Sequence, residues 1–306
     1  MPQTRDTRSN FLALPKKHST YNTSQIVVLP VPYEHTVSYA GGTKNGPKAI
    51  LDASRHVEFY DEELDRELCF DVGIATARSL SFGTKKKKVN KEALTYIENK
   101  VAELLADDKF VAVLGGEHSI SSAPIAAFLK KYPGLSILQF DAHSDFRDEF
   151  EGNKYSHASV MARVGEFLDP SNIVQVGIRA QAKEEAIYIQ EQGVSTYYAH
   201  EIRQGKFTRV LKHWEDQIID KLSENVYITF DVDYFDPSII PATGTPEPNG
   251  MNWHETMNIL QRLGKKKKIV GFDIVELAPI KGLHHPDMTV ARLAYKIMNY
   301  AFQNKR

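Results

Sequence analysis

The chain has 306 residues, with 38 basic and 39 acidic side chains and therefore a formal net charge of −1. Hydrophobic residues make up 42% of the chain and charged residues 25%, which suits a folded protein and excludes collagen-like, coiled-coil and largely disordered chains. The balanced charge argues against binding of nucleic acid through bulk electrostatics. No stretch of about 18 apolar residues is present, so we expect no membrane-spanning helix.

The N-terminal segment and the cysteine content bear on where the protein works. Residues 1–20 are mostly polar and contain no apolar run of signal-peptide length, so we expect a tail or an oligomer arm there and one domain over residues 21–306. Cys69 is the single cysteine and has no internal disulfide partner. This fits a reducing cytoplasm, and a lone thiol is usually a small core side chain rather than a nucleophile.

Short apolar, β-branched runs alternate along the chain with segments of helical spacing. The runs cover residues 25–29, 110–114, 135–140, 173–176, 194–198, 226–230 and 269–274. The helical spacing covers residues 91–105, 120–131, 182–191, 207–222, 253–263 and 287–301. Continuous apolar runs suit strands that are buried on both faces. The alternation predicts an α/β fold, a single three-layer α/β/α domain with a mainly parallel central sheet.

Local signals refine this outline at three places. Pro47, which follows Asn45 and Gly46, predicts a short helix that opens at the proline. Two lysine runs, at residues 85–88 and 265–268, can mark contact with nucleic acid or an anionic membrane. Because the overall charge is balanced and both runs lie at junctions of predicted elements, we interpret them as solvated loops.

Three polar clusters directly follow three of the apolar runs. They are GGEHS at residues 115–119, DAHSD at 141–145 and DVD at 231–233. Ligands of open parallel sheets bind beyond the carboxyl ends of the strands. Three strand ends would therefore bring acidic and imidazole side chains to one crevice.

The spacing within the clusters points to a metal centre. Alternate side chains of an extended segment share a face, so we expect Asp141, His143 and Asp145 to lie together. The same holds for Asp231 and Asp233. Four packed aspartates would repel strongly without a cation, and two divalent ions would balance their charge. Carboxylates with a few imidazoles suit Mn²⁺ and related ions, with Zn²⁺ or Ni²⁺ as alternatives.

Each cluster alone has an ordinary structural explanation. A histidine after a strand is usually hydrogen-bonded within the fold, and a DxD sequence is common in surface turns. The three clusters together, each at the end of a strand, are far more specific and predict a site for two metals. A hydroxide and one further carboxylate would leave the crevice negative, which favours a cationic substrate.

These motifs resemble the metal signatures of the ureohydrolases, the family of arginases and agmatinases. The signatures lie at residues 141–145 and 231–237, and PATGTPEP at 241–248 resembles the loop that follows the second. The similarity extends from about residue 11 to the last helix and implies the arginase-like fold. It implies two metals per subunit, usually manganese, one held by His118, Asp141, Asp145 and Asp231. The other would be held by Asp141, His143, Asp231 and Asp233, so that Asp141 and Asp231 bridge.

The resemblance also implies the activity of two further residues. Two metals lower the pKa of a bridging water and give the hydroxide that attacks a guanidinium carbon. Glu276 resembles the family carboxylate that grips the guanidinium, although an exposed loop charge is the plainer structural alternative. His157 resembles the family histidine that carries a proton to the leaving amine, with a capping or packing histidine as the alternative.

The loops beside the motifs favour agmatine as the substrate. Residues 146–155 carry acidic and aromatic side chains and lack the Asn/Ser pattern with which arginases recognise an amino acid. This loop and the TGTPEP loop, with Thr245 as a candidate substrate contact, resemble bacterial and archaeal agmatinases. An acidic, aromatic-rimmed pocket suits agmatine, a dication without a carboxylate. We therefore expect hydrolysis of agmatine to putrescine and urea by a homo-oligomer, since such relatives are commonly trimers or hexamers.

Several alternatives stay open. Asn249 and Ala158 stand where relatives commonly carry glycine, and both changes affect the surroundings of the pocket. The same chemistry on guanidinobutyrate, guanidine, an aminopropylated agmatine or formiminoglutamate is one alternative. Two others are a family member without catalysis and a metal-dependent deacetylase with a single metal. The complete ligand set argues against the first, and the paired aspartates argue against the second.

Overall fold

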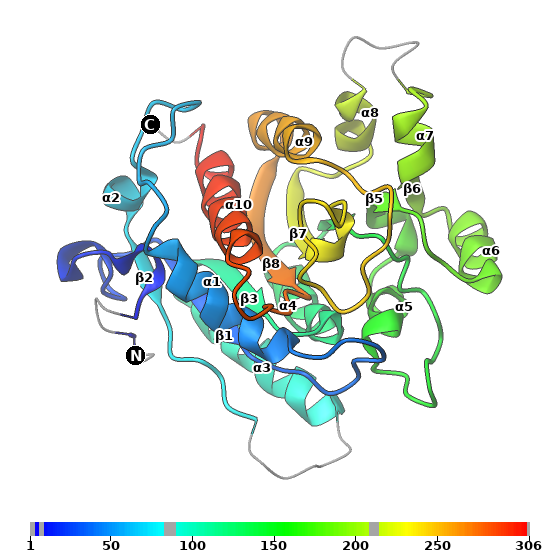
Figure 1. Ribbon diagram of the computed structural model, residues 1–306, viewed down its shortest axis with the longest axis horizontal. Coiled ribbons are helices and arrows are strands. Elements are labelled where there is room, and N and C mark those ends of the chain that lie inside the picture. The colour runs from blue at the N-terminus through cyan, green and yellow to red at the C-terminus, as the bar shows by residue number, and fades with distance from the viewer. Residues whose placement is uncertain (1–3, 6–8, 83–89, 208–213, 305–306) are drawn as a thin grey trace.

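An eight-stranded sheet forms the centre of the part of the chain that the computed structural model describes, residues 4–5, 9–82, 90–207 and 214–304. The strand order is β2-β1-β3-β8-β7-β4-β5-β6, and every neighbouring pair is parallel (Figure 1). The strands are β1 Ile26–Val31, β2 Ile74–Thr76, β3 Phe110–Gly115, β4 Ser136–Phe140, β5 Ile173–Ile178, β6 Ser195–Tyr198, β7 Asn225–Asp231 and β8 Lys268–Val275. The seven predicted strands are confirmed. Strand β2 was not predicted, because three residues at a sheet edge form too short an apolar run to stand out.

Helices cover both faces of this sheet. They are α1 Gly46–Ser54, α2 Leu68–Val72, α3 Asn90–Ala106, α4 Ser122–Lys131, α5 Val160–Gly165, α6 Lys183–Gln192, α7 Ala199–Arg203, α8 Glu215–Asp220, α9 Trp253–Lys266 and α10 His285–Ala301. On one face α10 packs between α1 and α9, and on the other α4 packs between α3 and α5 (Figure 1). The predicted three-layer α/β domain is confirmed, and its sheet is entirely parallel.

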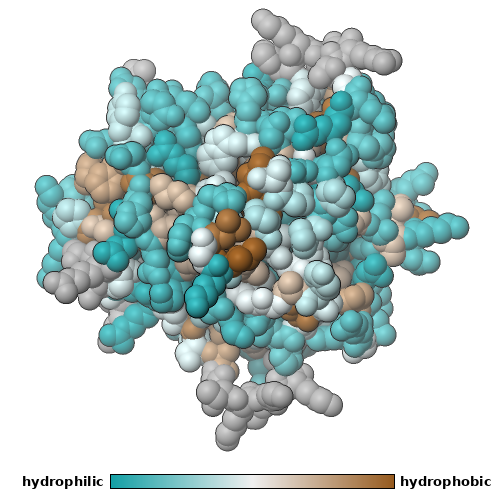
Figure 2. All heavy atoms as spheres, in the orientation of Figure 1, coloured by the Kyte–Doolittle hydropathy of each residue, from teal (hydrophilic) through white to brown (hydrophobic). Residues whose placement is uncertain are grey.

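The strand side chains divide between two hydrophobic cores. In β1, Ile26 and Val28 belong to the core beneath α1, α9 and α10, whereas Val27 and Leu29 belong to the core beneath α3 and α4. Both sets are buried, as expected for a parallel strand covered on two faces. With the apolar side chains collected inside, the face seen in Figure 2 is mostly polar, with apolar residues in small separate patches.

Most of the predicted helices are present, with one clear correction. The segment 120–131 begins as a 3₁₀ turn, His118–Ser121, and continues as α4. The predicted helix over 207–222 is shorter among the described residues: α8 covers Glu215–Asp220, and the part of the prediction at residues 208–213 lies outside the described chain. The chain turns toward β7 just after α8, where the backbone N–H of Ser223 donates to Ser136 Oγ at 2.9 Å. The short helix predicted at Pro47 is confirmed as α1.

Part of the predicted N-terminal tail belongs to the folded domain. Phe11, Leu12 and Leu14 are buried in the core beneath α1. The backbone N–H of Phe11 donates to Thr76 Oγ1 at 2.8 Å, and that of Leu12 donates to Ser54 Oγ at 2.9 Å. The overall polarity of residues 1–20 concealed this short apolar run, whose burial anchors the segment.

Three smaller expectations can be compared with the structure. Lys265 and Lys266 lie in the last turn of α9 and Lys268 begins β8, so the second lysine run is not the predicted loop. The first run, at residues 85–88, lies outside the described chain. Cys69 is buried, as expected of a core side chain. No helix among the described residues has both the length and the apolar character needed to cross a membrane.

Candidate metal centre and catalytic site

The polar clusters meet where four neighbouring central strands end. His118 follows β3, Asp141 and His143 follow β4, Asp233 follows β7 and Glu276 follows β8. These strands are adjacent in the order β3-β8-β7-β4, so residues from distant parts of the chain emerge side by side. The position is the usual one for ligands of an open parallel sheet.

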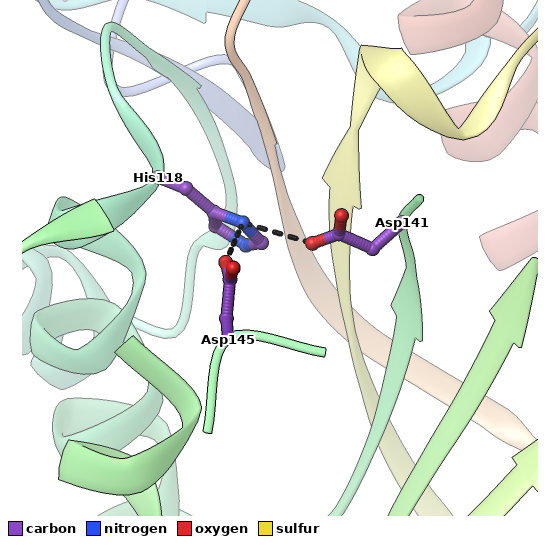
Figure 3. A group of neighbouring side chains, drawn as sticks. All are labelled: His118, Asp141 and Asp145. Atoms are coloured by element: carbon purple, nitrogen blue, oxygen red, sulfur yellow. Dashed lines mark ion pairs between the residues drawn. The ribbon is translucent and has the colours of Figure 1, made fainter. Parts of the chain in front are cut away.

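His118 lies at the centre of the first half of the cluster. Its Nδ1 is 3.1 Å from Asp141 Oδ2, 3.0 Å from Asp145 Oδ2 and 3.3 Å from Asp231 Oδ2. Figure 3 shows the imidazole pointing between Asp141, at the end of β4, and Asp145, which lies farther along the segment that follows this strand. All four side chains are buried. One nitrogen and three carboxylates converging on one point form a ligand set for a divalent cation.

His143 forms the second half with two aspartates. Its Nδ1 is 2.9 Å from Asp233 Oδ2 and 3.7 Å from Asp141 Oδ1. The ligand atoms of Asp141, His143 and Asp233 lie within 4.8 Å of one another, as do those of His118, Asp141 and Asp145. Asp141 is common to both groups, so it lies where a ligand that bridges two cations would be.

The side chains reach the cluster by a backbone path other than the extended one predicted from their spacing. Asp145 has a positive φ of 57°, which turns its carboxylate back toward His118. Asp233 lies in a 3₁₀ turn, Val232–Tyr234, not in a continuation of β7. The expectation that these residues share a site is confirmed, but the reason given for it, alternation in an extended segment, is wrong.

Hydrogen bonds hold the carboxylates in these orientations. The backbone N–H of His143 donates to Asp141 Oδ1 at 2.6 Å, and the Gln139 amide donates to Asp141 Oδ2 at 2.8 Å. The backbone N–H of Asp233 donates to Asp231 Oδ1 at 2.9 Å. Each of these carboxylate oxygens keeps a lone pair for a further contact. The Oδ2 atoms of Asp141 and Asp231 both lie close to His118 Nδ1.

The far side of the His118 ring fixes which nitrogen carries the hydrogen. Thr229 Oγ1 lies 2.9 Å from Nε2 and donates its own hydrogen to Asp273 Oδ1 at 2.8 Å. The threonine oxygen must therefore accept from Nε2, which leaves the Nδ1 lone pair facing the carboxylates. This buried Nδ1 has no hydrogen-bond partner among the described residues. An orphaned imidazole nitrogen amid three carboxylates fits a divalent cation.

The electrostatics of the cluster lead to the same conclusion. Burial, with the charges of Asp145 and Asp233, raises the pKa of Asp141 to about 7. Burial likewise raises the pKa of Asp231 well above its usual range. Burial also acts against ionisation of Asp233, but the charge and hydrogen bond of His143, together with the hydrogen bond from the Ala142 N–H, outweigh it and lower the pKa of Asp233 to about 2. Crowded carboxylates of this kind hold protons unless cations take their place.

A cavity of about 450 Å³ opens directly onto the cluster. The three residues predicted to act on the substrate, His157, Glu276 and Thr245, line it together with five of the six predicted metal ligands. The remaining lining side chains belong to Ser38, Arg147, Phe150, Ala158, Arg179, Ala180, Gln181, Glu185 and Glu247. Asp141 is the predicted ligand beneath this surface. The structure thus brings all the sequence-predicted site residues to one place.

Glu276 is a buried residue of the cavity wall. Its side chain is 7% exposed, so the alternative of an exposed loop charge is wrong. Oε1 accepts the backbone N–H of His118 at 2.6 Å, and the Glu276 N–H donates to the carbonyl of Gly116 at 2.8 Å. Burial raises the pKa of this carboxyl well above its usual range. A bound cation would reverse that shift, because it favours the ionised form.

His157 begins a short 3₁₀ helix, His157–Ser159, and lines the same cavity. Its backbone N–H donates to Thr36 Oγ1 at 3.0 Å, and its Nδ1 lies 3.3 Å from the same oxygen. The Phe150 ring meets the imidazole edge to face, with 5.8 Å between the ring centroids. The imidazole is therefore held between a polar and an aromatic neighbour.

Arg179 is a site residue that the motifs did not reveal. Its guanidinium donates to the carbonyls of Asp233 at 2.7 Å, Glu247 at 2.8 Å and Pro248 at 3.0 Å. It thereby ties the turn after β7 to the TGTPEP loop that carries Thr245. The sequence offers no local signal for this, because the contacts are with backbone atoms more than 50 residues away. Asn249, in the same loop, has a φ of 65°, a conformation that glycine adopts most readily.

Gly116 explains the double glycine before His118. A Cβ at this position would lie 1.9 Å from the carbonyl oxygen of Tyr33, far inside van der Waals contact. The Gly116 N–H donates to the Val31 carbonyl, and the Glu117 N–H donates to the Tyr33 carbonyl, both at 2.9 Å. The end of β3 therefore lies flush against the loop after β1, and only glycine fits there.

A model of the arginase family matches residues 24–302 of this sequence. The chain belongs to the arginase family. An N(1)-aminopropylagmatine ureohydrolase from Synechocystis is 37% identical over 291 residues, which cover 94% of this chain and 92% of that protein. An agmatinase from Bacillus cereus is 35% identical over 279 residues, 90% of either chain. The resemblance found in the motifs is thus confirmed.

Solved structures of the arginase family show the same fold. The crystal structure of an agmatine ureohydrolase of Thermoplasma volcanium aligns with a TM-score of 0.82 at 30% sequence identity. The alignment covers 93% of this chain and 92% of that one. The arginase-like fold that the family resemblance implied is therefore confirmed over nearly the full length.

Proposed function

We propose that this chain hydrolyses the guanidinium C–N bond of agmatine and releases putrescine and urea. The observation that carries this proposal is the single cavity lined by the acidic cluster, Glu276 and His157. A cation-binding carboxylate and a proton-carrying imidazole beside a two-cation ligand set are the groups that guanidinium hydrolysis requires. The agmatinase and aminopropylagmatine ureohydrolase among the relatives support a substrate of this kind.

Six side chains are available to hold two divalent cations, which we propose to be Mn²⁺. His118, Asp141, Asp145 and Asp231 would hold one cation. Asp141, His143, Asp231 and Asp233 would hold the other. When bound, such cations lower the pKa of water and so supply hydroxide near neutral pH. Four aspartates neutralise two dications, and oxygen-rich ligand sets with few imidazoles suit manganese.

Glu276 and His157 act on different parts of the substrate: Glu276 binds the guanidinium, and His157 serves the nitrogen that leaves. The Glu276 carboxylate accepts hydrogen bonds from the guanidinium nitrogens and orients the central carbon toward the acidic cluster. Water adds its oxygen to that carbon, the bond from carbon to the alkylated nitrogen breaks, and urea forms. The amine leaves as an ammonium ion, and His157 holds and delivers the proton that this nitrogen needs. The products, urea and an alkylammonium, balance one water and one guanidinium.

The charge of the cavity wall favours a guanidinium substrate without a carboxylate. If two cations neutralise the four aspartates, Glu185, Glu247 and Glu276 remain against Arg147 and Arg179. The Arg179 donors are already used by backbone carbonyls, and Arg147 stacks over Phe150 with 5.3 Å from Cζ to the ring centroid. One negative charge is left over, that of Glu276, which pairs with the guanidinium. Arg147 Nε also lies 3.7 Å from Glu185 Oε2, so neither arginine is free to pair with a substrate carboxylate. Thr245, in the TGTPEP loop, lines the same cavity, and we propose that it contacts the alkyl chain of the substrate.

N1-aminopropylagmatine is the second candidate substrate. The relative with 37% identity carries that name, and the longer substrate bears one more amine than agmatine. Both compounds present the same guanidinium to Glu276 and differ only in the length and charge of the other end. The residues that contact that end therefore decide between them.

A substrate panel tests the proposal. Purified protein loaded with Mn²⁺ is assayed for urea release from agmatine, N1-aminopropylagmatine, arginine, guanidinobutyrate and guanidine, and for amine release from formiminoglutamate. We expect activity on the first two and a kcat/KM for arginine lower by at least about tenfold, the equivalent of roughly 1.4 kcal/mol. Activity confined to a substrate that bears a carboxylate contradicts the proposal. Light scattering on the same sample tests the predicted trimer or hexamer.

A further inference from the structure

Glu117 is a buried carboxylate beside the site that the proposed reaction does not use. It is 0% exposed and stands directly before His118 at the end of β3. Its Oε2 accepts the backbone N–H groups of His35 and Thr36 at 2.5 and 2.6 Å. Its Oε1 accepts the hydroxyls of Thr36 at 2.8 Å and Ser119 at 2.5 Å. Four donors therefore converge on this carboxylate and hold the loop after β1 against the site.

Thr36 connects this carboxylate to His157. A threonine hydroxyl has one hydrogen, and the Thr36 hydrogen goes to Glu117 Oε1. The Thr36 oxygen can then only accept from its other neighbours. It accepts the backbone N–H of His157 at 3.0 Å, and it lies 3.3 Å from His157 Nδ1. The second contact is favourable only when Nδ1 carries a hydrogen.

From this geometry we infer that Glu117, through Thr36, fixes the tautomer of His157, so that Nδ1 keeps its hydrogen and Nε2 is the nitrogen that exchanges protons with the substrate. Thr36 and Glu117 are then positioning residues, because neither lines the cavity nor reaches the substrate. The inference rests on the proposed function for the identity of the proton acceptor. The tautomer itself is a property of the resting protein.

The other surroundings of His157 also favour the tautomer with its hydrogen on Nδ1. Phe150 contacts the ring edge to face and offers no lone pair to Nδ1. The cavity that His157 lines holds the reacting amine, so a basic Nε2 is needed to carry the proton there. If the hydrogen were on Nε2, Nδ1 and Thr36 Oγ1 would face each other as two lone pairs, and the ring would lose its anchor.

Two substitutions of Thr36 separate the hydroxyl from the shape of the side chain. Thr36→Val keeps the β-branched volume and removes the hydroxyl, whereas Thr36→Ser keeps the hydroxyl. We expect Thr36→Val to lower kcat for the best substrate about tenfold to a hundredfold, within the range of general acid–base catalysis, with KM changed less than about twofold. The kcat of Thr36→Ser, which keeps the hydroxyl, should stay within about threefold of that of the parent chain.

Thr43→Val is the matched control. Thr43 lies in the segment that follows the same loop, and its hydroxyl donates to Glu34 Oε2 at 3.2 Å. The control thus removes a threonine hydroxyl from another glutamate without touching His157. It should leave kcat and the His157 tautomer unchanged. Equal losses of kcat in Thr36→Val and Thr43→Val would show a general loosening of the loop and overturn the inference.

The tautomer is measured directly by NMR on protein with ¹⁵N-labelled histidine, loaded with diamagnetic Zn²⁺. The His157 signals are assigned by their loss in His157→Asn. We expect hydrogen on Nδ1 in the parent chain and in Thr36→Ser, and a shift toward hydrogen on Nε2 in Thr36→Val. Hydrogen on Nε2 in the parent chain overturns the inference. If valine lowers the melting temperature by more than a few degrees, Thr36→Ala replaces it in both measurements.

This readout separates the inference from the proposed function. Because the NMR spectrum needs no turnover, the tautomer is determined even if no substrate of the panel reacts. A parent chain with the expected tautomer and no guanidinium hydrolysis disproves the proposed function and leaves the Glu117–Thr36–His157 arrangement intact. A parent chain that hydrolyses the guanidinium but carries the hydrogen on Nε2 of His157 disproves the inference and leaves the proposed function intact.

Discussion

The Glu276 carboxylate accepts the backbone N–H of His118 at 2.6 Å, across the ends of β8 and β3. The residue proposed to grip the guanidinium is therefore joined by one hydrogen bond to a proposed metal ligand. Glu276 also has a positive φ of 64°, which turns its side chain from the line of β8 into the cavity. Two adjacent parallel strands thus fix the position of the Glu276 carboxylate relative to the acidic cluster.

Glu276→Gln should separate the charge of this side chain from its place in the fold. Glutamine keeps an oxygen for the His118 N–H but loses the charge that pairs with a guanidinium. We expect kcat/KM to fall about 10²- to 10³-fold, the equivalent of roughly 3–4 kcal/mol, because a buried charge-assisted pair is broken. Glu34→Gln, a nearby change outside the cavity, should alter kcat/KM less than about twofold. Steady-state urea release measures both, and equal effects would contradict the assignment of Glu276.

The stability of the metal-free protein should fall as the pH rises. The pKa of Asp141 is raised to about 7, above its unfolded value of about 4. A carboxyl group of this kind stabilises the folded state fully below its unfolded pKa and loses that effect as the pH passes its folded pKa. The raised pKa of Asp231 acts in the same direction, and the raised pKa values of His118 and His143, whose unfolded value is about 6.5, extend the loss of stability above pH 7. Thermal melts after chelation should show a falling Tm from about pH 4 to pH 7.

Divalent cations should cancel this loss. Metal ligands bind in their deprotonated form, so Mn²⁺ should raise the Tm more at pH 8 than at pH 5. Asp231→Asn removes one of the crowded charges and one proposed ligand. This variant should have a higher metal-free Tm than the parent chain and a much smaller Tm increase with Mn²⁺. A parent Tm that rises with pH after chelation, or that ignores Mn²⁺ at pH 8, would show that the cluster is not a cation site.

Arg179→Lys should weaken the link between the turn after β7 and the TGTPEP loop and so destabilise the folded protein. An ammonium has three donors and no planar fork, so it cannot replace a guanidinium that donates to the carbonyls of Asp233, Glu247 and Pro248 together. We expect a loss of about 1–3 kcal/mol in the free energy of unfolding, because partly buried carbonyls lose their partners. Arg262→Lys, in the partly exposed pair with Asp216, should cost less than about 1 kcal/mol. Urea denaturation of the two variants makes the comparison.

The buried pair of Lys296 and Asp61 gives a prediction independent of catalysis. Lys296 Nζ lies 3.0 Å from Asp61 Oδ2, and both residues are almost fully buried where α10 meets the segment before α2. Lys296→Met leaves the aspartate uncompensated and should cost about 3–5 kcal/mol of unfolding free energy. Adding Asp61→Asn should recover part of that loss. A double variant less stable than the sum of the two single changes would contradict the charge argument.

Local patterns were sufficient for the strands of the core and for the residues of the metal cluster. Each long apolar run became a buried strand, and the polar residues that follow β3, β4 and β7 became the cluster. These predictions depend on short-range sequence and on one general rule, that parallel strands end at a common edge. The helix predicted over 207–222 was too long at its C-terminal end, because helical spacing alone does not show where tertiary contacts end an element. Strand β2 was missed because its stability comes from pairing with β1.

The strand–helix alternation, the three acidic motifs and the resemblance to the ureohydrolases could be predicted from the sequence, because each depends on neighbouring residues. The burial of Glu276, the turns that bring Asp145 and Asp233 to the cluster, and the link that Arg179 makes between two loops became visible only in the folded chain. The hydrogen bonds that connect Glu117 to Thr36 and Thr36 to His157 likewise became visible only in the folded chain. Those relationships join residues from 36 to 276 across separate strands, and hydrogen-bond direction and burial exist only once the sheet has brought these segments together.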